Sequence, residues 1–151
     1  MFKNLKNKIK NKILASDNLN DCLNYICGQL KNNLEGYDWV GFYFHIETEK
    51  QLELIAFSGN PTEHVKIPFG KGICGQTATS NSSYISNDVS KELNYISCNI
   101  NVKSEIVVPL FNKKNRNVGQ IDIDSNNFNQ FSSHDLEFLE SINKMISERF
   151  F

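Results

Sequence analysis

The sequence has almost no excess of charge of either sign. Its 151 residues include 16 Lys and Arg against 17 Asp and Glu, which gives a formal net charge of -1 at pH 7. Such an even charge balance supplies no overall electrostatic field to hold a nucleic-acid backbone, because that binding depends on contacts to many phosphates. We therefore expect neither DNA nor RNA as the main partner.

Long hydrophobic runs are missing as well. No uninterrupted apolar stretch approaches the roughly 18 residues that a membrane span requires. The lysine-rich start also lacks the apolar core of a secretory signal peptide. Lysines from Lys3 to Lys12 alternate with apolar residues at helical spacing, a pattern typical of a solvated helix face rather than of a membrane anchor. We expect no membrane partner and a cytoplasmic protein.

The four cysteines lack the C-x-x-C spacing of zinc knuckles and of thioredoxin-type motifs. Cys22 and Cys27 lie on or beside an apolar helical stripe, so we expect both to be small buried hydrophobes. Cys74 and Cys98 lie in a segment rich in Gly, Ser and Asn, and they are the candidates for reactive thiols. In a reducing compartment, a disulfide between them would be transient and part of the chemistry.

The length predicts one domain over residues 1–151, because neither an internal repeat nor a linker interrupts the chain. Hydrophobic residues make up 40% of the sequence, which is enough for a core without disulfides or a structural metal. Apolar spacing predicts helices over 2–14 and 19–30, with Asp17 as a possible cap between them. A third helix is predicted after Ser132, with Asp135 completing its capping box.

Aromatic and β-branched residues predict two hairpins. One joins residues 39–44 and 52–57 through a charged turn, and the other joins 106–111 and 118–124 through a polar turn. Between them, from about 59 to 103, long periodic elements are scarce, and a segment of this kind is usually functional. Helices at both ends and strands in the middle predict an α+β domain, a central antiparallel sheet with the N-terminal and C-terminal helices packed on it.

The segment Gly70-Lys71-Gly72-Ile73-Cys74-Gly75 matches G-x-G-x-x-G in form only. A dinucleotide site needs a βαβ unit, whereas here a proline turn precedes the glycines and a polar loop follows them. The segment instead predicts a glycine-shaped loop that leads into a short helix near Cys74. We expect the N-terminus of that helix to lower the pKa of the thiol.

Three acids stand in strand-like surroundings: Glu105, Asp122 and Asp124. Asp122 and Asp124 share one strand face, because side chains alternate with period two. Either this face is exposed to water, or the carboxylates share a cation or a proton. Trp39 and Tyr43 also share a face, as a core pair or, if the acids lie beside them, as walls of a pocket for an ammonium group.

Five blocks in series resemble the free methionine-R-sulfoxide reductase family of GAF domains. The blocks are DWVGFY at 38–43, IPFGKGICG at 67–75, YISC at 95–98, SEIVVPL at 104–110 and GQIDIDS at 119–125. The resemblance covers the chain from about residue 15 to the C-terminal helix. It implies a GAF fold, usually a homodimer, that reduces the R epimer of free methionine sulfoxide and is restored by thioredoxin. We expect no cofactor.

Carried over position by position, the resemblance assigns the two candidate thiols. It implies that Cys98 is the attacking nucleophile, which becomes a sulfenic acid. Cys74 is then a second redox cysteine that closes a disulfide with Cys98. Where the family usually has a third cysteine, this chain has His64, which leaves Cys74 as the resolving thiol. A metal site from His64, both cysteines and an acid is disfavoured by the irregular spacing, and we expect none.

The resemblance also gives the acids and aromatics their roles. Glu105, Asp122 and Asp124 match the acids that hold the substrate and polarise its sulfoxide, while Trp39 and Tyr43 match residues that line the pocket. Sulfoxide oxygen is a poor leaving group without a proton donor, and we assign that task to Glu105 or Asp124. Asp122, together with whichever of Glu105 and Asp124 is not the proton donor, would pair with the substrate's amino group. The alternative function is a non-catalytic GAF module that senses a small molecule.

Overall fold

An antiparallel sheet organises the chain, which a computed structural model describes over residues 2–93, 95 and 101–151. In that part of the chain the sheet has six strands in the order β3-β2-β1-β6-β5-β4. The strands are β1 (Trp39–Ile46), β2 (Gln51–Ser58), β3 (Lys66–Pro68), β4 (Tyr84–Ser86), β5 (Ser104–Phe111) and β6 (Asn117–Ser125). The helices are α1 (Phe2–Ala15), α2 (Leu19–Asn33), α3 (Gly72–Ser80) and α4 (Ser133–Phe150), with a short 3-10 turn η1 (Val89–Lys91).

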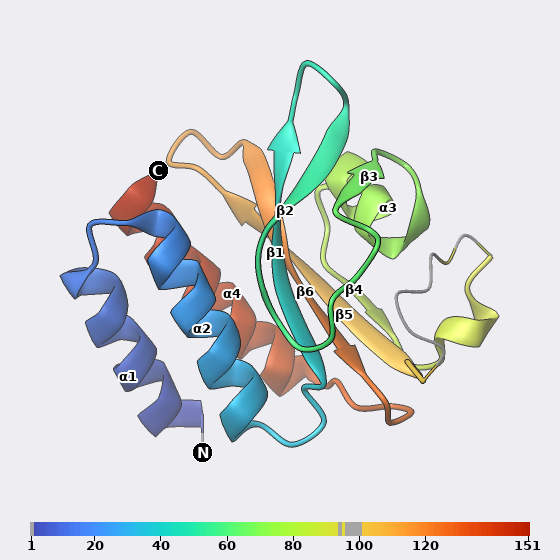
Figure 1. The fold of residues 1–151 in the computed structure, drawn as a ribbon, viewed down its shortest axis with the longest axis horizontal. Coiled ribbons are helices and arrows are strands. Elements are labelled where there is room, and N and C mark those ends of the chain that lie inside the picture. The colour runs from blue at the N-terminus through green and yellow to red at the C-terminus, as the bar shows by residue number, and fades with distance from the viewer. Residues whose placement is uncertain (1, 94, 96–100) are drawn as a thin grey trace.

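The two faces of the sheet carry different layers. Helices α2 and α4 cover one face, α1 packs on the outer side of these two helices, and α3 lies on the other face (Figure 1). Strand residues alternate between these faces, so β1 sends Val40 and Phe42 into the large core under α2 and α4. The β1 residues Trp39 and Tyr43 point to the opposite face and belong to a smaller core under α3. The expected α+β fold is confirmed.

The predicted helices and hairpins are confirmed as elements. The C-terminal helix has the predicted capping box: the Ser132 side chain accepts a hydrogen bond from the N–H of His134 at 3.2 Å, and the N–H of Ser132 donates to Asp135 Oδ2 at 2.9 Å. The weakly patterned middle of the chain forms only short elements where the structure describes it. Among them is the predicted helix near Cys74, which is α3 and has 9 residues.

The cap of α2 differs from the prediction. Helix α2 begins at Leu19, so the preceding residue Asn18 is the N-cap, and its side chain accepts from the N–H of Asp21 at 3.0 Å. Asp17 lies one position too early to reach those N–H groups. Its carboxylate instead lies 3.1 Å from Arg149 Nη2 near the end of α4.

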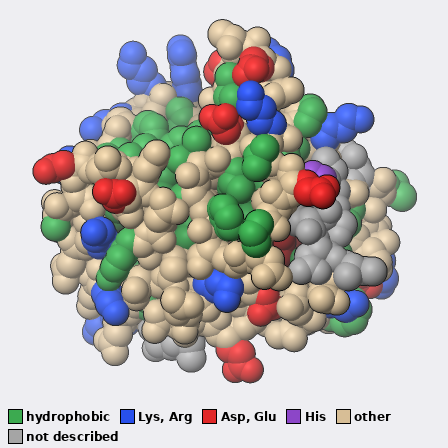
Figure 2. Space-filling model, viewed as in Figure 1, with side chains coloured by type: hydrophobic (Ala, Val, Ile, Leu, Met, Phe, Trp, Pro, Cys, Tyr) green, Lys and Arg blue, Asp and Glu red, His purple; other side chains and the backbone are tan. Residues whose placement is uncertain are grey.

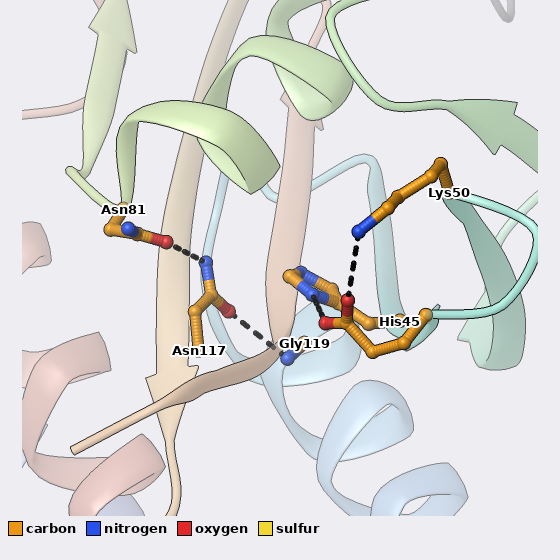
Figure 3. Close-up of polar contacts among 6 residues, drawn as sticks. His45, Lys50, Asn81, Asn117 and Gly119 are labelled. Atoms are coloured by element: carbon orange, nitrogen blue, oxygen red, sulfur yellow. Dashed lines mark hydrogen bonds and ion pairs between the residues drawn. The ribbon is translucent and has the colours of Figure 1, made fainter.

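The C-terminal end of α3 is tied to the sheet. Asn81 caps the helix with a φ of 59°, in the left-handed region, and its side-chain oxygen accepts from Asn117 Nδ2 at 3.2 Å. Asn117 in turn accepts from the N–H of Gly119 on β6 at 3.1 Å (Figure 3). In the same view His45 and Lys50 both contact Glu47 at the turn of the first hairpin. The contacts of Asn117 with Asn81 and Gly119 tie the C-terminal end of α3 to β6, the strand that carries Asp122 and Asp124.

Charged side chains of both signs are mixed over the visible surface, with no patch of one sign (Figure 2). This distribution agrees with the even charge balance of the sequence. Within the part of the chain that the structure describes, none of the helices combines the length and the apolar character needed to cross a membrane.

Candidate active site

Three carboxylates lie side by side on the sheet face that α3 covers. The register of β5 and β6 places Glu105 opposite Asp124. Asp122 lies two residues before Asp124, on the same face of β6. The predicted shared face is therefore confirmed. The exposed fractions of Glu105, Asp122 and Asp124 are only 5%, 2% and 3%, so the alternative of a solvent-facing strand is wrong.

The thiol of Cys74 points at these acids from the first turn of α3. Its Sγ lies 3.9 Å from Glu105 Oε2. The potential ligand atoms of Cys74, Glu105 and Asp122 all lie within 4.8 Å of one another. Gln120 on β6 anchors the helix here, because its Nε2 donates to the carbonyl of Cys74 at 3.2 Å. The sheet thus fixes the position of the sulfur relative to the carboxylates.

The environment of Cys74 raises the pKa of its thiol, contrary to the expectation from the sequence. Burial is the largest cause, because it disfavours the thiolate, and the negative charges of Asp122, Glu105 and Asp124 add to it. The helix N-terminus offers only about half a positive charge. Loss of water and nearby carboxylates outweigh it, so Cys74 is held as a neutral thiol.

The two aspartates of β6 are also shifted toward their neutral forms. Burial raises the pKa of Asp122, and burial together with the charge of Asp122 raises the pKa of Asp124 well above its usual range. One oxygen of each carboxylate, Oδ1, accepts no hydrogen bond from the described residues. Neither aspartate forms an ion pair with another of the described residues. The site therefore has unused capacity to accept hydrogen bonds or to neutralise a cation.

Two aromatic residues of β1 form a wall beside the acids. Trp39 is the register partner of Asp124, and its ring centroid lies 6.4 Å from that of Tyr43. The indole Nε1 donates to the carbonyl of Asn60 at 2.9 Å, and the Tyr43 hydroxyl donates to the carbonyl of His64 at 2.8 Å. The predicted shared face is confirmed, and the aromatic pair lies next to the carboxylates.

Small hollows flank the carboxylates on two sides. One, of about 10 Å³, is lined by Ile67, Lys71, Gly72, Ile73, Cys74, Glu105 and Asp122. The other, of about 80 Å³, is lined by Asp38, Trp39, Asn60, Pro61, Thr62, Val102, Asp124 and Asn126. A single water needs roughly 10–15 Å³. The first hollow therefore has to widen before it can admit an organic ligand.

The structure places most of the predicted site residues together. Cys98 lies outside the described residues. Cys22 and Cys27 are fully buried in the core among the N-terminal helices, as expected of structural cysteines. His64 does not belong to the one group of closely spaced metal-ligating side chains among the described residues, which is Cys74, Glu105 and Asp122.

The sequence patterns did not identify two polar residues of the site, Gln120 and Ser86. Gln120 lies on the same face as Asp122, two positions earlier, so the period of the strand could have identified it. Ser86 on β4 lies opposite Glu105, is 2% exposed, and its hydroxyl has no hydrogen-bond partner among the described residues. Its three-residue strand gives too little pattern to predict this placement.

Comparison of the sequence with known proteins identifies relatives that match most of the chain. The family model described as a GAF domain matches residues 16–144. The free methionine-R-sulfoxide reductase of Saccharomyces cerevisiae is 36% identical over 132 residues, which cover 87% of this chain and 73% of the yeast protein.

Solved structures agree with this result. Free methionine-R-sulfoxide reductase from Neisseria meningitidis, in complex with its substrate, matches with a TM-score of 0.93 and 31% identity over 99% of this chain and 87% of that chain. The reduced form of fRMsr of Staphylococcus aureus matches with a TM-score of 0.91 and 33% identity over 99% of this chain and 95% of that chain. The chain therefore belongs to the free methionine-R-sulfoxide reductase family of GAF domains.

Proposed function

We propose that this protein reduces free methionine-R-sulfoxide to methionine, with Cys98 and Cys74 as its redox pair. The observation that carries the proposal is the buried group of Glu105, Asp122 and Asp124 around the Cys74 thiol. Relatives named for this reaction match most of the chain, and one of them was solved with its substrate.

The aspartates suit a substrate that carries a free amino group. Asp122 and Asp124 each have an oxygen without a hydrogen-bond partner among the described residues, and an α-ammonium group can donate three hydrogen bonds to such oxygens. A methionine sulfoxide within a peptide has no α-ammonium to offer. Binding at Asp122 would therefore select the free amino acid, while Trp39 and Tyr43 line the path of its side chain.

In the first step the sulfur of Cys98 attacks the sulfoxide sulfur. The sulfur–oxygen bond breaks, the oxygen passes to Cys98 as a sulfenic acid, and methionine leaves with its sulfur reduced by two electrons. A positioned acid must donate a proton or a strong hydrogen bond to the oxygen. The raised pKa of Asp124 keeps it protonated more readily than an exposed aspartate, which supports this role, and Glu105 is the alternative donor.

Cys74 acts in the second step. As a neutral thiol it does not compete with Cys98 for the substrate. Its proton can pass to Glu105, whose Oε2 lies 3.9 Å away, as its sulfur attacks the sulfenic acid. Water leaves, and the Cys98–Cys74 disulfide forms. Thioredoxin then restores both thiols by exchange. A homodimer and a cytoplasmic location belong to the same proposal.

The test is consumption of free methionine-R-sulfoxide with dithiothreitol or with thioredoxin as reductant. The wild type is compared with Cys98→Ser and Cys74→Ser. We expect Cys98→Ser to lose turnover with both reductants, and Cys74→Ser to fail mainly with thioredoxin. If the wild type turns over with neither reductant, the catalytic proposal is wrong. In that case the buried acids serve a GAF module that binds a small molecule without converting it.

A further inference from the structure

We propose that Ser86 is a positioning residue for Glu105, and that its hydroxyl donates a hydrogen bond to this carboxylate once Cys74 has left it to form a disulfide. This inference rests on the proposed function and deepens it, because it concerns the second step of that reaction. The sheet register brings Ser86 to the site, although Ser86 lies outside all five sequence blocks.

A row of side chains crosses four neighbouring strands under α3. Ser86 of β4 is the register partner of Glu105 on β5. Glu105 is in turn the partner of Asp124 on β6, which is followed by Trp39 on β1. Directly opposed residues of an antiparallel pair have their side chains on one face, with Cβ atoms about 4.5–5.5 Å apart. Ser86 therefore lies at the end of the row, within reach of the Glu105 side chain.

The hydroxyl of Ser86 has unused hydrogen-bonding capacity. Ser86 is 2% exposed, and its Oγ is buried with no hydrogen-bond partner among the described residues. Burying a hydroxyl without a partner costs free energy. The buried Ser104 of β5 avoids this cost, because its Oγ donates to the carbonyl of Asn127 at 2.6 Å. Ser86 is thus a donor beside a carboxylate that the resting state does not use.

Cys74 contacts Glu105 in the resting state, where its thiol donates to Glu105 Oε2 across 3.9 Å. In the second step of the proposed reaction this contact is lost. The thiol proton passes to Glu105, and the sulfur of Cys74 bonds to that of Cys98. The sulfur–oxygen bond of the sulfenic acid breaks, and the hydroxide takes the proton from Glu105 and leaves as water. Glu105 is then a buried carboxylate beside a sulfur that carries no proton.

The other acids of the site are poor replacements for the lost donor, because an ionised carboxylate only accepts hydrogen bonds. Asp122 and Asp124 can donate to Glu105 only while they hold a proton. Asp124, the favoured proton donor of the first step, has by then given its proton to the sulfoxide oxygen. The Ser86 hydroxyl keeps its proton throughout. A hydrogen bond from Ser86 to Glu105 therefore stabilises the disulfide state more than the dithiol state.

A double-mutant cycle on stability tests the contact without any turnover. Cys74→Ala removes the thiol donor permanently, so the Ser86 hydroxyl should bond to Glu105 in that background. Ser86→Ala alone should change the unfolding equilibrium constant by less than about threefold, because the deleted hydroxyl has no partner. In the Cys74→Ala background the same substitution should raise that constant by about tenfold or more, because a hydrogen bond to a charged group is lost. Chemical denaturation of the four proteins measures both changes.

Ser104→Ala is the matched control. Ser104 is a buried serine next to Glu105 in the sequence, but its side chain points to the other face of the sheet and bonds to the Asn127 carbonyl. We expect its loss of stability to be the same with and without the Cys74 thiol. Absence of coupling between Ser86→Ala and Cys74→Ala, or an equal coupling for Ser104→Ala, would overturn the inference.

The redox equilibrium of the Cys74–Cys98 pair gives a second readout. Thr and Val have nearly the same shape, and only Thr carries a hydroxyl, so Ser86→Thr and Ser86→Val differ in the donor. Against dithiothreitol, we expect the disulfide of Ser86→Val to be about tenfold easier to reduce than that of Ser86→Thr, a shift of about 30 mV. Equal reduction potentials in the two variants would contradict the role of Ser86.

The two measurements separate this inference from the proposed function. If the wild type forms no Cys98–Cys74 disulfide and consumes no methionine-R-sulfoxide, the proposed function fails. Coupling between Ser86 and Cys74 in the stability cycle still supports the contact of Ser86 with Glu105 in that case. If turnover is normal and the cycle shows no coupling, the proposed function stands and the role of Ser86 is rejected.

Discussion

Glu105 and Asp124 are direct register partners across β5 and β6, and both side chains are buried on the face under α3. Opposed acids destabilise a sheet when both are charged. Here Asp122 adds a third carboxylate two residues from Asp124. The strands therefore hold an arrangement that costs folding free energy, which is typical of a binding or catalytic site rather than of a core.

Asp124→Asn should stabilise the folded protein at neutral pH by about 1–3 kcal/mol, because Asn avoids the free energy that folding costs when it either buries the Asp124 carboxylate or protonates it above its ordinary pKa. The folded-state pKa of Asp124 is raised above its ordinary value of 3.8, so the folded chain binds this proton more tightly than the unfolded chain. Wild-type stability consequently falls as pH rises from 3.8 through the folded-state pKa. The gain in the variant should vanish below pH 3.8, as thermal unfolding at several pH values would show.

A second variant tests whether replacing any buried acid would stabilise the folded protein in the same way. Asp135 is a buried acid that accepts hydrogen bonds from the N–H of Ser132 and from the Tyr37 hydroxyl. Asp135→Ala should lose about 1 kcal/mol at pH 7, because the capping box of α4 is broken. A stability gain in both variants at pH 7 would contradict our interpretation of the Asp124 environment.

Cys74 should react slowly with iodoacetamide at pH 8, since the acids and burial raise the pKa of its thiol. Asp122→Asn removes one of the charges that raise this pKa, so the onset of alkylation should move to lower pH. Peptide mapping by mass spectrometry would follow the rate at each cysteine. The buried Cys22 and Cys27 provide internal references that Asp122→Asn should not affect. An unchanged pH profile at Cys74 would exclude electrostatic control by Asp122.

Asp122→Ala should lower kcat/KM for free methionine-R-sulfoxide by about tenfold or more, because a charge-assisted contact to the ammonium group is lost. Steady-state kinetics on the free amino acid and on its N-acetyl derivative would test the assignment. The N-acetyl derivative has no ammonium group, so the variant should treat it much as the wild type does. An unchanged kcat/KM for the free amino acid would remove Asp122 from the binding site.

Trp39 is the single tryptophan of the chain, and it lies beside Asp124. Its fluorescence should therefore change when L-methionine is added, without interference from another indole. Trp39→Phe keeps an aromatic ring but loses the hydrogen bond from Nε1 to the Asn60 carbonyl. We expect a KM raised by several fold with a smaller effect on kcat. Titration of the wild type with no spectral change would place the ligand away from this wall.

Gly41→Ala should disturb the aromatic wall. A Cβ at Gly41 would lie 2.3 Å from Cη2 of Trp39, so the indole would have to move. We expect a loss of about 1–3 kcal/mol in unfolding free energy, with reduced activity. Gly28→Ala in α2 is the control, because a Cβ there meets nothing within 4 Å. It should be neutral or stabilising by up to about 1 kcal/mol. Chemical denaturation of both variants would show the difference.

Local patterns in the sequence determined much of the fold and part of the site. Helical spacing, the capping box at Ser132 and two runs of strand-forming residues predict the helices and hairpins, because each depends on neighbours within a few positions. Period-two alternation likewise places Asp122 and Asp124 on one face. The five sequence blocks, in their order along the chain, point to the family.

Only the tertiary structure decided what surrounds each group. The sequence predicts a helix at Cys74, whose N-terminus alone would lower the thiol pKa. The pKa is instead raised, because α3 packs over a sheet that brings Glu105, Asp122 and Asp124 to the sulfur from distant parts of the chain. Burial and charge act through space, so they depend on which segments the fold brings together. The spacing of residues along the chain determines secondary structure, and packing across the sheet determines the chemistry of the thiol.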